Sequence, residues 1–212
     1  MLLIGQFDSP FVRRVGVALQ LYDMAYEHRP WSVFGDADKV AAYTPLRRVP
    51  ALVLDDGEVL VDSASILDAL DGMVGPERAL VPPGGAERRA AMRVCALAAG
   101  AAEKAVSLVY ERMLHARATP AWIERCQGQI HAVLDALEAD RARRAAPYWH
   151  GGAIGHGDIM AACLLRFLSE AHPGLFDPAA WPALTAHAAR CEALPAFQRC
   201  AQPFTYIPPK EP

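Results

Sequence analysis

The chain changes its pattern at about residue 75, and this change limits the folds that it can adopt. Before this point, short apolar runs alternate with segments whose apolar residues have helical spacing. Glycine and proline pairs then interrupt the chain at 75–76, 82–83 and 84–85, and almost everything beyond them has a helical pattern. We therefore predict two domains, residues 1–75 and 86–212, joined by a linker at about 76–85.

The first part of the chain predicts a mixed sheet with helices packed on it. We expect strands at 2–5, 26–31, 51–54 and 58–61 and helices at 10–22, 36–43 and from 62 or 63 to about 70. Asp55-Asp56-Gly57 separates the last two strands, and Asp-Gly between apolar runs favours a hairpin. The order is β-α-β-α-β-β-α, and a strand-helix-strand start followed by a hairpin implies both parallel and antiparallel pairing.

The second part predicts an all-helical domain, with helices at about 86–117, 120–144, 156–172 and 181–193. The third of these has a clear start. With Gly155 as N-cap, Asp158 can reach back to the N–H of the cap residue, and Ile154 can pack on Ile159. Residues 159–165 are apolar on all sides, so we expect this helix in the middle of the domain.

Composition excludes several classes of protein. The formal net charge of -3 does not favour nucleic acid or an anionic membrane as a partner, and no apolar run approaches the ~20 residues of a membrane span. The N-terminus lacks a basic segment followed by a signal-type apolar region. The five cysteines form no C-x-x-C pair, so we expect a reducing, cytoplasmic setting with buried, inert thiols.

No metal site is predicted. His115, His150 and His156 have no second ligand at metal spacing, and we interpret them as surface or capping residues.

Ser9-Pro10 marks the start of the first helix. A serine at the N-cap accepts a backbone N–H, and proline at the first helical position has no N–H to leave unsatisfied. The start of such a helix carries roughly +0.5 of an elementary charge, so a hydroxyl there can help hold an anion. The alternative is that Ser9 only caps its helix.

Four motifs, in order along the chain, resemble those of the cytosolic glutathione transferase family. They are Ser9-Pro10-Phe11-Val12-Arg13-Arg14-Val15, Thr44-Pro45-Leu46-Arg47-Arg48-Val49-Pro50-Ala51-Leu52, Asp62-Ser63-Ala64-Ser65-Ile66-Leu67 and the capping segment around Asp158. The resemblance implies an N-terminal thioredoxin-like domain, an all-helical C-terminal domain and a homodimer. It also implies glutathione as co-substrate and a hydrophobic electrophile as its acceptor.

The resemblance assigns roles to individual residues. Ser9 would hold the glutathione thiolate, a cis Val49–Pro50 peptide would aim the Val49 backbone at the cysteinyl backbone, and Ser63 would bind the γ-glutamyl carboxylate. Asp62 would bind the γ-glutamyl ammonium, and Arg48 the glycyl carboxylate. The alternatives are a trans proline at a strand start, plain helix capping by Asp62 and Ser63, and an exposed Arg48 on a solvated loop.

An apolar electrophile site is expected between the two domains. The candidate residues are Phe11, Trp31, Phe34, Tyr110, Met113 and Leu114. Tyr110 could donate to a leaving group or carbonyl, or could instead belong to the core or an interface.

The sequence also departs from the family pattern. Gly155 replaces a serine or threonine cap, and no cysteine lies near Ser9, which argues against the members that reduce mixed disulfides. Pro10 and Phe11 replace the second serine and the cysteine of the zeta-type isomerases. The hypothesis is a conjugating transferase. A glutathione-dependent isomerase or dehalogenase, or a non-catalytic binding or dimerisation module, is the alternative.

Overall fold

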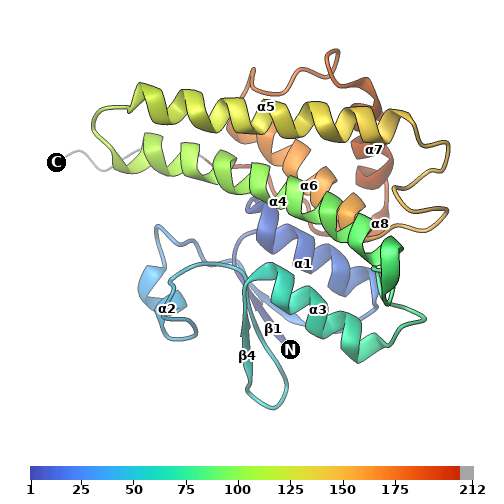
Figure 1. Cartoon of the computed structure of the whole chain (residues 1–212). Coiled ribbons are helices and arrows are strands. Elements are labelled where there is room, and N and C mark those ends of the chain that lie inside the picture. Colours follow the sequence, from blue (N-terminus) through green and yellow to red (C-terminus); the bar gives the residue numbers. More distant parts are fainter. Residues whose placement is uncertain (206–212) are drawn as a thin grey trace.

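The computed structural model describes residues 1–205, and its first part is a four-stranded mixed sheet with helices (Figure 1). The strands lie in the order β2-β1-β3-β4, with β1 parallel to β2 and antiparallel to β3, and with β3 antiparallel to β4. The element order β-α-β-α-β-β-α is as predicted. The elements are β1 Leu2–Ile4, α1 Pro10–Leu21, β2 Glu27–Arg29, α2 Ala37–Ala41, β3 Ala51–Val53, β4 Val59–Val61 and α3 Ser63–Val74.

The elements of this part differ from prediction mainly at their ends. Each strand has only three residues, so the predicted strands were too long. Helix α3 does not stop near residue 70 but continues to Val74, and Gly75 follows it with φ 79°. A positive φ suits glycine and ends a helix at little cost, whereas the earlier Gly72 is tolerated inside the helix.

The second part is helical, as predicted, and two long helices form its outer layer. In Figure 1, α4 and α5 run side by side, and α6 lies between this pair and α1. The predicted end of α4 at 117 was too late, and α8 was not predicted as a separate helix. The elements are α4 Gly85–Leu114, α5 Pro120–Ala142, α6 His156–Ala171, α7 Pro182–Glu192 and α8 Pro195–Arg199.

Helix α6 is the central helix of the second part, because 13 of its 16 residues are buried. Its Met160 and Leu164 belong to the apolar core formed with α4 and α5. Its Ile159 and Cys163 belong to a second core that also contains Val12 of α1 and residues of α3. Helix α6 therefore contributes to both cores and connects the two parts of the chain. The division into two domains stays a prediction.

The start of α6 explains the glycine that departs from the family pattern. An Asp158 carboxylate oxygen accepts the Gly155 N–H at 2.8 Å, and the other accepts the Trp149 N–H at 2.8 Å. A Cβ on Gly155 would lie 2.9 Å from the Leu80 carbonyl oxygen, which itself accepts the His156 N–H. The backbone at Leu80 lies too close to Gly155 for a side chain there, so the Asp158 carboxylate alone provides the cap.

A buried polar cluster connects α1, α3 and α6. Asp71 of α3 accepts the Tyr22 hydroxyl, lies 3.1 Å from the His156 Nε2 and accepts the Leu80 N–H at 3.1 Å. His156 is only 4% exposed, so its interpretation as a surface or capping residue was wrong. Burial raises the pKa of Asp71, but the bonds from His156 and Tyr22 outweigh it and leave the pKa below its usual value.

All five cysteines are free and buried. No helix within residues 1–205 combines the length and apolarity needed to cross a membrane.

The close crossing at Gly155 predicts that a conventional serine cap destabilises this protein. Gly155→Ser is expected to lower the free energy of unfolding by about 1–3 kcal/mol, because the Cβ must displace the Leu80 backbone. Urea denaturation measures the change. Gly152→Ser is the matched control, since nothing lies within 4 Å of a Cβ there. A Gly155→Ser protein as stable as the Gly152→Ser protein would contradict this account.

The polar cluster predicts a pH dependence of stability. A carboxyl group whose folded pKa is depressed stabilises the fold above its unfolded pKa, here 3.8, and loses that contribution as the pH falls through the lower folded value. Asp71→Asn is expected to cost about 1–3 kcal/mol at neutral pH, and this difference should shrink below about pH 4. Thermal unfolding across pH measures it. Asp68→Asn, exposed on the same helix, is the control and should change little. A constant Asp71→Asn deficit down to about pH 2 would refute the coupling.

Candidate functional site

Ser9 lies at the start of α1 with its hydroxyl available. Its backbone is extended, Pro10 follows as the first helical residue, and its Oγ accepts the Val12 N–H at the long distance of 3.5 Å. In that bond the Ser9 oxygen is the acceptor, so the hydroxyl hydrogen is free to donate to something else. Ser9 therefore caps the helix and can also donate to an anion at its positive end.

The turn at Val49–Pro50 lies beside the strand that leads to Ser9. Its peptide bond is cis, as the resemblance implied. Gly5, at the end of β1, has φ 127°, and a Cβ on it would lie 2.8 Å from the Val49 Cβ and 2.5 Å from a Val12 methyl carbon. Only glycine allows this approach, which brings the Val49 backbone close to the start of α1.

Asp62 and Ser63 form the start of α3. Asp62 has φ 69°, and its carboxylate accepts the Ala64 N–H at 2.8 Å. Asp62 is therefore the N-cap and Ser63 the first helical residue, which decides between the two predicted starts. Ser63 is 5% exposed, and its Oγ accepts a bond from Arg14 at 3.4 Å.

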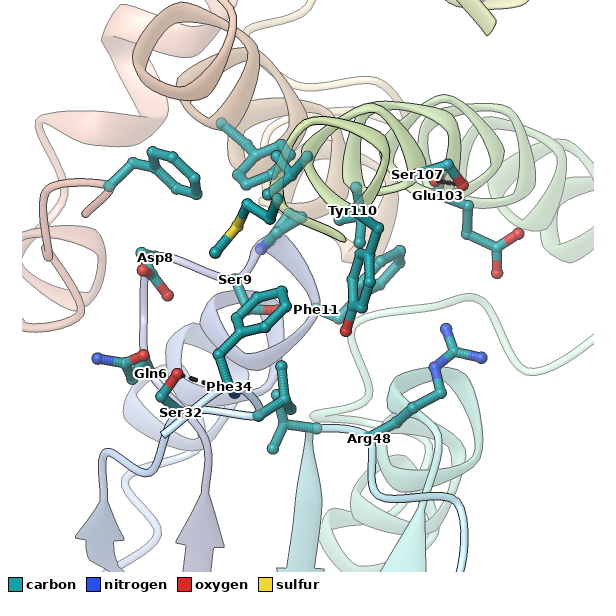
Figure 2. A pocket seen from close by; sticks show the side chains of 18 of the residues that line it. Gln6, Asp8, Ser9, Phe11, Ser32, Phe34, Arg48, Glu103, Ser107 and Tyr110 are labelled. Carbon is teal, nitrogen blue, oxygen red and sulfur yellow. Dashed lines mark hydrogen bonds between the residues drawn. The ribbon is translucent and has the colours of Figure 1, made fainter. Parts of the chain in front are cut away.

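A cavity of about 730 Å³ opens between these turns and helix α4. Figure 2 shows Ser9 at the start of α1, with Phe11 and Phe34 near it and Tyr110 extending down from α4. A smaller recess of about 40 Å³, lined by Pro50, Asp62 and Ser63 among others, adjoins the cavity. The residues that line both spaces are Phe11, Leu46, Arg48, Val49 and Glu103.

The structure brings most of the predicted site residues together. The cavity is lined by Ser9, Phe11, Trp31, Phe34, Arg48, Val49, Tyr110 and Met113. Pro50, Asp62 and Ser63 line the adjoining recess instead. Leu114 lines neither space and is 61% exposed. It is the last residue of α4, where the helix direction turns its side chain to solvent, so its assignment to the electrophile pocket was wrong.

Three ionisable side chains of the cavity, Tyr110, Asp8 and Glu111, have shifted pKa values, and the hydrogen bond from Thr119 lowers that of Glu111. Burial raises the pKa of Tyr110, opposed by the positive charge of Arg48, so the phenol stays protonated as a donor. Burial also raises the pKa of Asp8, opposed by hydrogen bonds from the backbone N–H groups of Thr205 and Ser9. No group of three or more metal-binding side chains occurs among residues 1–205.

Sequence reasoning missed part of the lining. Glu103, Ser107 and Tyr110 follow one another at i, i+4 and i+7 on α4, and this spacing was a signal that they share a face. No local signal marks the rest, because they come from loops, other helices and the C-terminal segment. They include Gln6, Asp8, Ser32, Trp122, Phe167, Phe204 and Thr205.

Comparison with known proteins identifies the family. Residues 3–78 match the model of the glutathione S-transferase N-terminal domain, and residues 120–190 match that of the C-terminal domain. The chain belongs to the glutathione S-transferase family. The thioredoxin-like domain followed by a helical domain, predicted from the resemblance, is thereby confirmed.

Solved and curated relatives of this transferase agree over nearly the whole chain. A glutathione S-transferase from Methylobacterium radiotolerans, in complex with glutathione sulfonate, is 28% identical with a TM-score of 0.88, covering 96% of this chain and 97% of that one. A family member from Pseudomonas fluorescens with bound glutathione is 31% identical with a TM-score of 0.83, covering 96% and 99%. A probable glutathione S-transferase of Oryza sativa is 26% identical, covering 90% of this chain and 84% of the relative.

Proposed function

We propose that this transferase binds glutathione with its sulfur beside Ser9 and joins that sulfur to a hydrophobic electrophile in the cavity. The observation that carries the proposal is the position of Ser9, a helix N-cap whose hydroxyl hydrogen is unused, on the wall of a 730 Å³ cavity. The relatives with glutathione or glutathione sulfonate bound support the choice of ligand.

Glutathione lies where the cavity and the smaller recess meet, at the residues that line both. Its cysteinyl main chain pairs with the N–H and C=O of Val49, which lines both spaces. Its γ-glutamyl carboxylate lies at Ser63 and the start of α3, where free backbone N–H groups attract an anion. Asp62 takes the γ-glutamyl ammonium, and Arg48, at the shared rim, takes the glycyl carboxylate.

The electrostatic requirement at the sulfur is modest. A free thiol has a pKa of about 8.5, and lowering it by about two units needs roughly 2.7 kcal/mol in favour of the thiolate. A charge-assisted hydrogen bond from Ser9 contributes on the order of 1.5–3 kcal/mol, and the start of α1 adds about 0.3–1 kcal/mol. These contributions together reach the required size, with the thiolate as nucleophile and no covalent enzyme intermediate.

The electrophile lies against aromatic side chains from both parts of the chain. Phe11 and Phe34 come from the first part, and Tyr110 from α4 lies with its ring centroid 5.1 Å from that of Phe34. The protonated Tyr110 hydroxyl is placed to donate to a carbonyl or leaving group of the electrophile. Family membership supports three further parts of the proposal: a homodimer, a cytoplasmic location and a role in detoxification.

Ser9→Ala tests the mechanism. Losing the hydrogen bond should raise the pKa of the bound thiol by about one to two units and lower kcat/KM at neutral pH roughly 10- to 100-fold. Conjugation of an aryl halide followed across pH measures both, and calorimetry should show that glutathione still binds. The variant also loses its helix cap, at a cost of about 1 kcal/mol.

Ser32→Ala is the matched control, since Ser32 lines the same cavity and its hydroxyl accepts the Phe34 N–H. Undiminished conjugation by Ser9→Ala with glutathione bound would overturn the role of Ser9. Absence of glutathione binding to the native protein would overturn the proposed function as a whole.

A further inference from the structure

Arg14 of α1 is a buried charge without a matching acid. It is 4% exposed, and its Nε is buried without a hydrogen-bond partner among the described residues. Within the described part of the chain, its side chain makes one hydrogen bond, from Nη1 to the Ser63 Oγ at 3.4 Å. No carboxylate within residues 1–205 lies within ion-pair distance of it. A buried guanidinium in this condition is costly to the fold.

The neighbouring Arg13 is also a buried arginine, but it has an acidic partner. Arg13 is 2% exposed, and its two terminal nitrogens bond the Glu192 carboxylate at 2.5 and 2.7 Å. Its Nε donates to the Cys200 carbonyl at 3.0 Å. Glu192 thus neutralises the charge of Arg13, whereas no carboxylate among residues 1–205 pairs with Arg14.

Asp62 is the carboxylate that favours the charged Arg14 guanidinium, but it makes no bond to it. Cys95 and Cys163 also lie near Arg14, but burial raises the pKa of both thiols, so they carry no negative charge. The Asp62 carboxylate is engaged with the Ala64 N–H at the start of α3. Asp62 is also exposed, so solvent screens its charge. Most of the positive charge of Arg14 is therefore not compensated by Asp62.

The hydrogen bond from Arg14 determines that the Ser63 hydroxyl acts as a donor toward any further partner. A guanidinium only donates, so the Ser63 oxygen is the acceptor in this bond and its hydroxyl hydrogen remains available. Ser63 lines the smaller recess beside Asp62 and Pro50. A donor hydroxyl, the backbone N–H groups at the start of α3 and a buried positive charge behind them thus converge on one position for an anion.

We propose that Arg14 is a positioning residue that supplies, through Ser63, the buried counter-charge for the γ-glutamyl carboxylate of glutathione. This inference rests on the proposed function and deepens it. Arg14 does not touch the ligand. It orients the Ser63 hydroxyl as a donor and adds a positive charge that solvent does not screen. The ligand carboxylate supplies the anion that no side chain among residues 1–205 provides.

The charge-free Arg14→Met variant, which keeps a long side chain, tests this with two ligands. One is glutathione, and the other is 4-aminobutyryl-cysteinyl-glycine, which is glutathione without the γ-glutamyl α-carboxylate. Calorimetry gives a Kd for each ligand with each protein. We expect Arg14→Met to weaken glutathione binding roughly 10- to 100-fold and to bind the analogue as well as the native protein does, or better.

The unfolding temperature provides a second readout, since a purely structural role of Arg14 predicts that Arg14→Met lowers it. Without ligand, Arg14→Met should unfold at the same temperature as the native protein or higher, because an unpaired buried charge is replaced by an apolar side chain. Arg93→Met removes an exposed charge from α4 and controls for net charge; both its Kd values should be unchanged. Arg14→Lys, which keeps the charge, should retain most of the preference for glutathione.

Equal weakening of both ligands by Arg14→Met would show that Arg14 is merely structural and would overturn the inference. Unchanged glutathione binding would overturn it as well. Failure of Arg14→Met to fold would contradict the stability expectation and indicate a structural role, and the two Kd values are then measured with Arg14→Gln to decide whether the role in binding remains. If the native protein binds glutathione no better than the analogue, the placement of the carboxylate at Ser63 is wrong. If it binds neither, the proposed function itself fails.

Discussion

The burial of helix α1 on almost all sides is the constraint on which the rest of this structure depends. Nine of its 12 residues are buried, two of them arginines. The helix packs against α3 in its own part of the chain and against α6 and α8 in the other part. Such a helix cannot shift without disturbing both cores, so its N-terminus is held in a fixed position at the edge of the cavity.

Polar residues at the two ends and on the sides of α1 each make a different contact. Ser9 begins it at the cavity, and Arg13 joins it to α7 through Glu192. Arg14 reaches under the start of α3, and Tyr22, just past the end of the helix, bonds Asp71 in the cluster that includes His156. The polar groups on an otherwise apolar helix therefore account for how the two parts of the chain and the site are held in register.

Local chemistry made the backbone of the site predictable from sequence. Ser9-Pro10 and Asp62-Ser63 are helix starts whose signals lie within a few residues. The predicted helix ends that were wrong by more than two residues are those of α3, where Gly75 follows the helix, and of α4. The burial of Arg14 and His156 was not predictable in this way. Helical spacing identifies an apolar face, but it does not tell which polar side chains the neighbouring helices will cover, and these partners lie 49 and 85 positions away in the chain.

The distribution of charge in the proposed binding mode also bears on the reactivity of the sulfur. Glutathione carries two carboxylates, and in the proposed mode an arginine compensates each of them: Arg48 at the rim and Arg14 behind Ser63. The sulfur is served only by a neutral hydroxyl and the start of a helix. Because the nucleophilicity of a thiolate falls as its pKa falls, a cation beside the sulfur would increase the amount of thiolate but weaken its attack. A site that concentrates full positive charge on the carboxylates therefore gains affinity for the tripeptide and leaves the thiolate reactive.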